Sequence, residues 1–205
     1  MRKQSAVRLL VGSTLMALVA AGAASLAQAP LAVRTGRVSI AGTSNVHSYT
    51  ASTTKVQVTE TRIAALPAGT EFWEHVLKPG AVEAFAISIP AATLASPKGD
   101  LDKNMLKALK VHEFPDITFR LLRVETRDTP VARRAIGILK IAGVEREVAM
   151  AITTRRTGET LTVAGTVDLL MSDYGITPPK AMMGMLKTDD KVTVTFETVL
   201  TIPTT

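Results

Sequence analysis

Apolar and polar residues alternate along much of the chain, and this period of two most constrains what it can fold into. In the last such segment, Val192, Val194 and Phe196 share one face, with polar residues between them. Because successive side chains of a strand point to opposite faces, each alternating segment predicts a strand with one buried face. Eight segments are predicted as strands: 33–40, 46–60, 82–89, 117–125, 133–141, 144–154, 161–169 and 191–202. Segment 82–89 is apolar on both faces, so we expect it to be covered on both sides. Eight sequential antiparallel strands favour an all-β barrel or sandwich, and pairing of the last strand with the first would remove both free edges.

Three segments interrupt this pattern. Leu101, Met105 and Leu109 recur at helical intervals, which predicts a short helix over about 100–111 with Asp100 as its cap. Residues 63–80 hold two prolines and two glycines and favour a loop with one helical turn. The segment 172–190 is rich in glycine, proline and methionine and is expected to be irregular.

The first residues have the pattern of an export signal. Three basic residues and no acidic ones precede the apolar run 9–24, and small residues follow at Ser25 and Ala27. We therefore expect a signal peptide over 1–27, cleaved after Ala27, and one domain over 28–205. An uncleaved membrane anchor is the alternative, although the run is short for a bilayer span.

Charge and cysteine content exclude several classes of protein. Of 24 basic residues, three lie in the signal, so 21 remain against 18 acidic residues, a net charge of +3 that does not indicate nucleic-acid binding. Without cysteine the chain has no disulfides and no thiolate chemistry. His47, His75 and His112 lie far apart in the sequence, without carboxylates at ligand spacing, so we expect no metal site and no cofactor. No nucleophile–base pattern is present either, which favours a protein that is not an enzyme.

An apolar interior is the remaining functional feature. A barrel of eight strands either fills with side chains or holds one small ligand. Small residues at expected interior positions, such as Ala84 and Gly137, favour a hollow interior. The methionines near 171–185 suit an irregular apolar ligand, or are ordinary core residues.

Four segments together resemble the YceI-like family of exported bacterial proteins. They are GTSNVHSY (42–49), LDKNMLKALKVHEFPDITFRL (101–121), LKIAGVEREVAM (139–150) and SDYGITPP (172–179). Tyr49 stands where many relatives have Trp. The resemblance implies an extended, eight-stranded, lipocalin-like barrel, a periplasmic location, and an elongated pocket for a long-chain amphiphile, typically a polyisoprenoid.

The resulting interpretation is a lipid carrier or store in the periplasm. We expect thirteen residues to contact the ligand, the last three of them at its polar headgroup: Phe85, Met105, Leu109, Phe114, Phe119, Met171, Tyr174, Met182, Met183, Leu186, His47, Tyr49 and Lys187. Two alternatives stay open. One is an enzyme for a hydrophobic substrate with His47 or His112 as base, and the other is an interaction module with a filled interior. Transient contact with a membrane surface and a homodimer are also left open, and no nucleic-acid partner is expected.

Overall fold

The computed structural model describes residues 31–66, 71–126, 132–181 and 186–202. The strands are β1 (Ala32–Ser44), β2 (Ser48–Thr53), β3 (Gln57–Ile63), β4 (Val82–Pro90), β5 (Asp116–Thr126), β6 (Ala132–Ile141), β7 (Val144–Thr157), β8 (Thr160–Leu170), β9 (Lys180–Ala181) and β10 (Leu186–Thr201). The helices are α1 (Phe72–Val76) and α2 (Gly99–Ala108), with single 3₁₀ turns η1 (Ala91–Thr93) and η2 (Met171–Tyr174).

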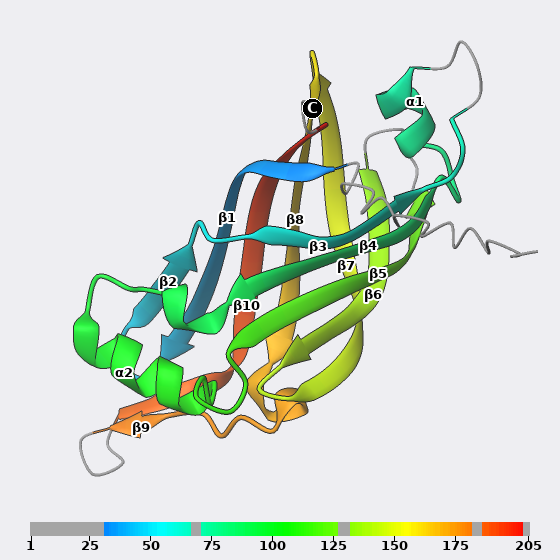
Figure 1. The fold of residues 1–205 in the computed structure, drawn as a ribbon. Helices are drawn as coiled ribbons and strands as arrows, with labels where there is room; N and C mark the ends of the chain where they lie inside the picture. Colours follow the sequence, from blue (N-terminus) through cyan, green and yellow to red (C-terminus); the bar gives the residue numbers. More distant parts are fainter. Residues whose placement is uncertain (1–30, 67–70, 127–131, 182–185, 203–205) are drawn as a thin grey trace, which may run out of the picture.

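The strands form one antiparallel sheet that curls on itself (Figure 1). Its order is β2-β1-β10-β8-β7-β6-β5-β4-β3, and the short β9 pairs with β10. The expected pairing of the last strand with the first is confirmed, because β10 runs antiparallel to β1 from Ala32↔Thr201 onward. The strands at the two ends of this order, β2 and β3, follow each other in the chain. Counted as one bent strand, they give the eight long strands of the expected lipocalin-like barrel.

The bend between β2 and β3 corrects the single strand expected over 46–60. The Thr53 hydroxyl accepts a hydrogen bond from the Lys55 main-chain nitrogen at 3.0 Å, and the Val56 nitrogen donates to the Thr54 carbonyl at 3.2 Å. These local bonds turn the chain, as threonine side chains do when they replace ladder partners. Val56 is buried in the bend, and its Cβ would lie 3.1 Å from a Cβ added to Gly36 of β1. The bend therefore brings the two ends of the sheet together.

The helix α2 lies where the sequence predicts one, but it is shorter and is capped differently. It ends at Ala108, followed by turns to residue 113, and Lys98 rather than Asp100 occupies the N-cap position. Asp102 accepts a hydrogen bond from the Ser96 main-chain nitrogen at 2.7 Å. The Asp100 side chain points into solvent and forms an exposed ion pair with Lys103 at 3.5 Å.

The irregular segment expected over 172–190 is also shorter than predicted. It begins with the 3₁₀ turn η2, and β10 already starts at Leu186, five residues before the alternation becomes visible. Asp190 holds the two parts together, because its carboxylate accepts hydrogen bonds from the Ser172 nitrogen at 2.8 Å and the Ser172 hydroxyl at 2.5 Å. These bonds lower the pKa of Asp190.

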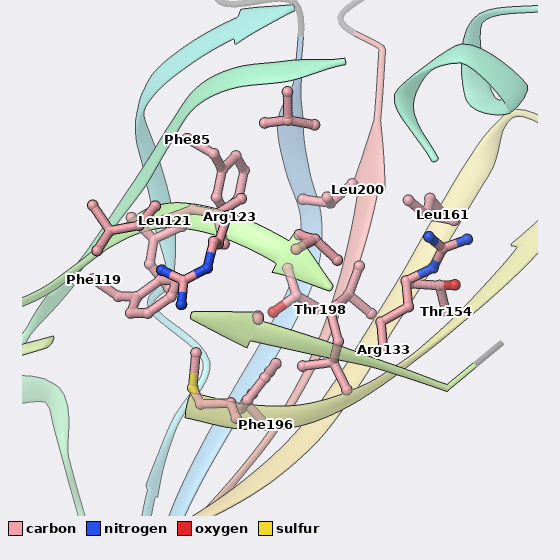
Figure 2. A pocket seen from close by; sticks show the side chains of 18 of the residues that line it. Phe85, Phe119, Leu121, Arg123, Arg133, Thr154, Leu161, Phe196, Thr198 and Leu200 are labelled. Carbon is pink, nitrogen blue, oxygen red and sulfur yellow. The ribbon is translucent and has the colours of Figure 1, made fainter. Parts of the chain in front are cut away.

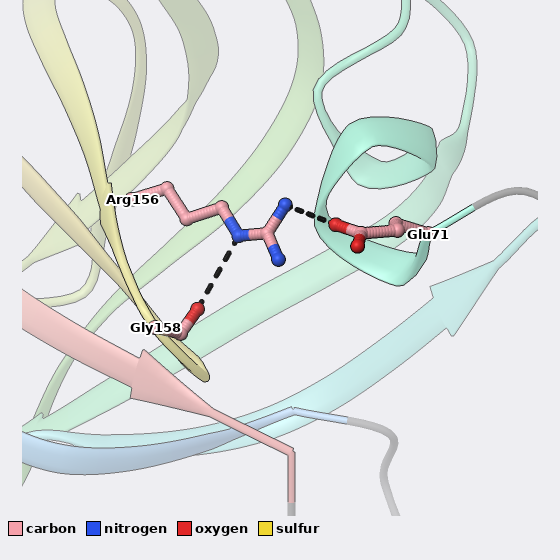
Figure 3. A network of polar contacts seen from close by, with 3 residues as sticks. All are labelled: Glu71, Arg156 and Gly158. Carbon is pink, nitrogen blue, oxygen red and sulfur yellow. Dashed lines mark hydrogen bonds and ion pairs between the residues drawn. The ribbon is translucent and has the colours of Figure 1, made fainter.

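The two helices, α1 and α2, lie at opposite ends of the curled sheet (Figure 1). Trp73 anchors α1, since it is only 2% exposed and packs with Leu31, Leu161 and Leu200. An ion pair between Arg156 and Glu71 joins the start of α1 to the β7–β8 hairpin, and the Arg156 Nε donates to the Gly158 carbonyl at 3.3 Å (Figure 3). The packing of Trp73, rather than the exposed ion pair, fixes α1 over this end of the barrel.

Candidate functional site

A large apolar cavity lies inside the barrel. Its volume is about 300 Å³, and the inward faces of seven strands contribute to its wall. Figure 2 shows Phe85, Phe119, Phe196, Leu161 and Leu200 around it. Further lining residues are Leu31, Val38, Val76, Val82, Ile87, Ile89, Ile117, Leu121, Val124, Ala135, Leu139, Met150, Ile152, Val163, Val167 and Val194. A wall of this composition suits an apolar chain and offers little to a polar substrate.

Two glycines keep the centre of the barrel open. A Cβ on Gly165 would lie 2.6 Å from the Phe196 ring, and one on Gly137 would lie 2.4 Å from the Phe119 ring. Each ring thus occupies the space that a side chain on the neighbouring strand would take. The two rings therefore pack over glycines of the adjacent strands, and glycine–aromatic pairs of this kind are also used to shape designed barrels.

The cavity opens near α1, between the start of β4 and the end of β5. The ladder between these strands runs from Pro90↔Asp116 to Ala86↔Arg120, and β5 bulges around Leu122 just beyond it. The exposed lining residues gather here: Lys78, Pro79, Gly80, Leu122 and Arg123. A bulge re-aims the side chains around it, and here it interrupts the regular wall of the cavity.

Polar side chains lie at this open end and not in the middle of the cavity. Arg133 is half-buried and donates from Nη1 to the Leu77 carbonyl at 3.0 Å, so it ties β6 to the end of α1. Arg123 Nε lies 3.0 Å from a carboxylate oxygen of Glu125. Figure 2 shows both guanidinium groups, with Thr154 close to Arg133, and Thr198 also contributes to the wall. The arrangement separates an apolar chamber from a polar rim.

A second, smaller cavity of about 150 Å³ lies beneath α2. Its wall includes α2 and η2 residues together with strand residues: Ile40, Tyr49, Leu101, Asn104, Met105, Ala108, Leu109, Ile117, Ile141, Leu169, Leu170, Met171, Tyr174, Ile176, Pro179, Thr188, Val192 and Val194. Burial raises the pKa of Tyr174 to about 12. Burial, followed by the charge of Asp189, also raises the pKa of Tyr49. Both phenols therefore stay neutral at physiological pH.

The structure divides the expected ligand residues between these two cavities. Phe85 and Phe119 line the large one. Five others line the small one: Tyr49, Met105, Leu109, Met171 and Tyr174. Met182 and Met183 lie outside the described residues, and Leu186 is the first residue of β10.

Three expected residues lie away from both linings. Phe114 packs against Gly143 of the β6–β7 hairpin, where an added Cβ would be 2.5 Å from its ring. His47 is exposed in the turn before β2, and its main-chain nitrogen donates to the Ser44 hydroxyl at 3.1 Å. Lys187 is exposed as well, and its main-chain nitrogen donates to the Asn45 side chain at 2.8 Å.

Sequence reasoning missed most of the large cavity, namely the inward faces of β6, β7, β8 and β10. Leu161, Val163 and Val167 were visible as an alternating set, as were Val194 and Phe196. The alternation marks such residues as inward, but it does not distinguish a filled interior from a hollow one.

The histidines do not converge. His75 is buried, and its Nε2 donates to the Ala64 carbonyl at 3.0 Å, whereas His47 and His112 are exposed. Within residues 31–66, 71–126, 132–181 and 186–202, no group of three His, Asp or Glu side chains could hold a metal ion. In the same ranges, no helix has the length and apolarity to cross a membrane.

Solved structures share this fold. Burkholderia cenocepacia BcnA superposes with a TM-score of 0.63 at 16% identity, covering 80% of this chain and 95% of that one. A polyisoprenoid binding domain from Saccharophagus degradans, described as implicated in plant cell wall breakdown, gives 0.63 at 10% identity, covering 86% and 100%. A Campylobacter jejuni YCEI protein gives 0.52 at 15% identity, covering 73% and 85%.

Sequence comparisons give the family. A search of curated protein sequences found no match. The family model for the YceI-like domain matches residues 32–200, from the start of β1 almost to the end of β10. Except for Leu31, the match includes all the residues that line the two cavities. The chain therefore belongs to the YceI-like family.

Proposed function

We propose that this protein binds a long-chain amphiphile, a polyisoprenoid or a similar lipid, with its tail in the large cavity. The main support for this proposal is the wall of that cavity, in which apolar side chains surround about 300 Å³ and polar groups lie at one end. Burying a methylene contributes about 0.8 kcal/mol. A tail of several carbons therefore binds well without any specific polar contact, and shape decides which tail fits.

The kind of tail is suggested by the fold relatives. One of them is described as a polyisoprenoid binding domain, and it covers 86% of this chain. Phe85, Phe119 and Phe196 give the wall flat faces, which suit the planar double bonds of an isoprenoid as well as a saturated chain. The proposal therefore includes both kinds of tail.

We further propose that the protein acts in the periplasm as a carrier or store. The basic, apolar and small-residue pattern of residues 1–27 supports export. A protein that hides a tail from water can move it between membrane surfaces or hold it in reserve. Brief contact with a membrane would be the step at which the tail enters the opening between β4 and β5.

The cavity counts against the alternative of an interaction module with a filled interior. An enzyme on a hydrophobic substrate receives no support from the described residues, because His47 and His112 are exposed and line neither cavity. We therefore infer a binding protein.

The test is to identify what co-purifies with the protein from the native periplasm. Organic extracts of wild-type protein should contain a long-chain lipid at close to one equivalent by mass spectrometry. Val163→Phe places a ring in the cavity and should abolish this. Thr162→Phe, on the opposite face of β8, should retain the lipid. A wild-type protein that yields no lipid and takes up no fluorescent long-chain probe would rule out the proposal.

A further inference from the structure

The two cavities meet at a pair of side chains. Among the described residues, only Ile117 and Val194 line both the large and the small cavity. Both also pack against the same two hydrophobic clusters, one around Leu109 and Tyr174 and one around Val38. They therefore stand at the boundary between the chamber that opens near α1 and the chamber beneath α2.

The register of the strands explains why these two positions form the boundary. On β10, inward positions recur every second residue, so Val192 lines the small cavity, Val194 lines both, and Phe196 lines the large one. On β5, Ile117 is the first inward residue after the chain leaves the turn that follows α2. The position of the boundary is therefore set by the two-residue spacing of inward side chains along β5 and β10.

We propose that Ile117 and Val194 form a partition that limits the length of the tail the protein accepts. This inference rests on the proposed function, because it assumes that a tail enters the large cavity. A tail that enters near α1 extends toward α2 and stops at these two side chains. The small cavity lies behind them and is closed to the tail in the wild-type protein.

The chemistry of the two residues suits this role. Both are β-branched, so each has restricted freedom about χ1 and cannot swing aside as a methionine can. Both are also half-buried within packed clusters, which hold them further. The flexible Met105 lies behind the partition, in the wall of the small cavity, where it could adapt to a tail end once the partition is opened.

Saturated fatty acids of increasing length test the partition. Their affinities are measured by displacement of the fluorescent fatty acid cis-parinaric acid, below their critical micelle concentrations. Each methylene that enters the cavity should tighten binding about fourfold, and the gain should stop at a defined length in the wild-type protein. Val194→Ala should move that length upward, because the tail then continues into the small cavity. Ile117→Val, a milder change, should move it less.

The control is Val192→Ala, which removes the same atoms from the same strand two residues away. Val192 lines the small cavity alone, so this variant should keep the wild-type limit. Circular dichroism melting establishes that each variant is folded at the assay temperature. Because Ile117→Val deletes only one methyl group, it tests the limit even where Val194→Ala unfolds.

The outcomes separate this inference from the proposed function. An unchanged limit in both partition variants, or an equal shift in Val192→Ala, overturns the partition while leaving tail binding intact. A wild-type affinity that rises without a limit also overturns it. Absence of binding at every length overturns both the partition and the proposed function.

Discussion

Gly165 offers the sharpest test of how the hollow interior is built. A Cβ at this position would lie 2.6 Å from Cζ of Phe196, 2.7 Å from the Ala151 carbonyl oxygen and 2.9 Å from Cγ2 of Ile152. Real Cβ atoms essentially never lie closer than 3.0 Å to another heavy atom in this way, so a neighbour must shift. Moving the ring alone does not relieve the clash, because the Ala151 oxygen belongs to the main chain of β7, which pairs with β8 at this point.

Gly165→Ala should therefore destabilise the protein by about 1–3 kcal/mol, the usual cost of adding a methyl group to a packed site. The displaced Phe196 ring should also narrow the large cavity and weaken binding of a long-chain probe. Urea denaturation followed by circular dichroism measures the loss, which should appear as a lower midpoint at an unchanged m-value. Gly99→Ala is the matched control, since a Cβ there meets nothing within 4 Å and Gly99 begins α2.

A double variant separates the ring from the main chain. Phe196→Leu removes the ring edge that faces Gly165, so Gly165→Ala should cost less in that background than in the wild-type protein. Coupling energies between residues in contact are about 0.5–3 kcal/mol. Strictly additive effects, or a Gly165→Ala protein as stable as wild type, would refute the view that the ring occupies the space above this glycine.

Three further predictions follow from polar groups. Glu71→Gln should lower the free energy of unfolding by less than about 1 kcal/mol, and added salt should erase the difference, because the ion pair with Arg156 is exposed. Tyr49 and Tyr174 are the only tyrosines, and since folding raises the pKa of both, absorbance at tyrosinate wavelengths should rise only above pH 10. Stability should fall as pH increases from 10 through about 12, and Tyr174→Phe should reduce this loss. His75→Ala should destabilise by about 1–3 kcal/mol, measured by urea denaturation, because it removes a buried side chain and leaves the half-buried Ala64 carbonyl without this donor.

The strands could be predicted from the sequence because alternation reports burial directly. Hairpin turns could be predicted as well, because glycine marks them. In the β6–β7 hairpin, Ala142 and Gly143 adopt positive φ at the expected turn, and the strands pair from Ile141↔Val144. The bend at Thr54–Val56 could not, because it depends on a hydroxyl that replaces a ladder partner, and Thr and Val are also the residues that strands favour. A Thr-rich strand and a Thr-mediated bend have the same composition.

The candidate site could be predicted only in part, for a similar reason. Phe114, one of the expected ligand contacts, lines neither cavity and covers Gly143, whose φ of +83° and missing side chain leave room for the ring. Phe119 has the same glycine relation, with Gly137, but lies inside the barrel. Which aromatic ring faces a ligand depends on which face of the sheet its glycine occupies, and that requires the register.

This dependence explains how proteins at 10–16% identity to this chain can share its fold. The fold requires only that inward positions be apolar, and many substitutions satisfy this. The length and shape of the chamber depend on far fewer positions, namely the two glycine and ring pairs and the boundary at Ile117 and Val194. Under the proposed partition, a single change at the boundary would alter the accepted tail without disturbing the alternation. The ligand of each member should therefore be inferred from these positions rather than from the family.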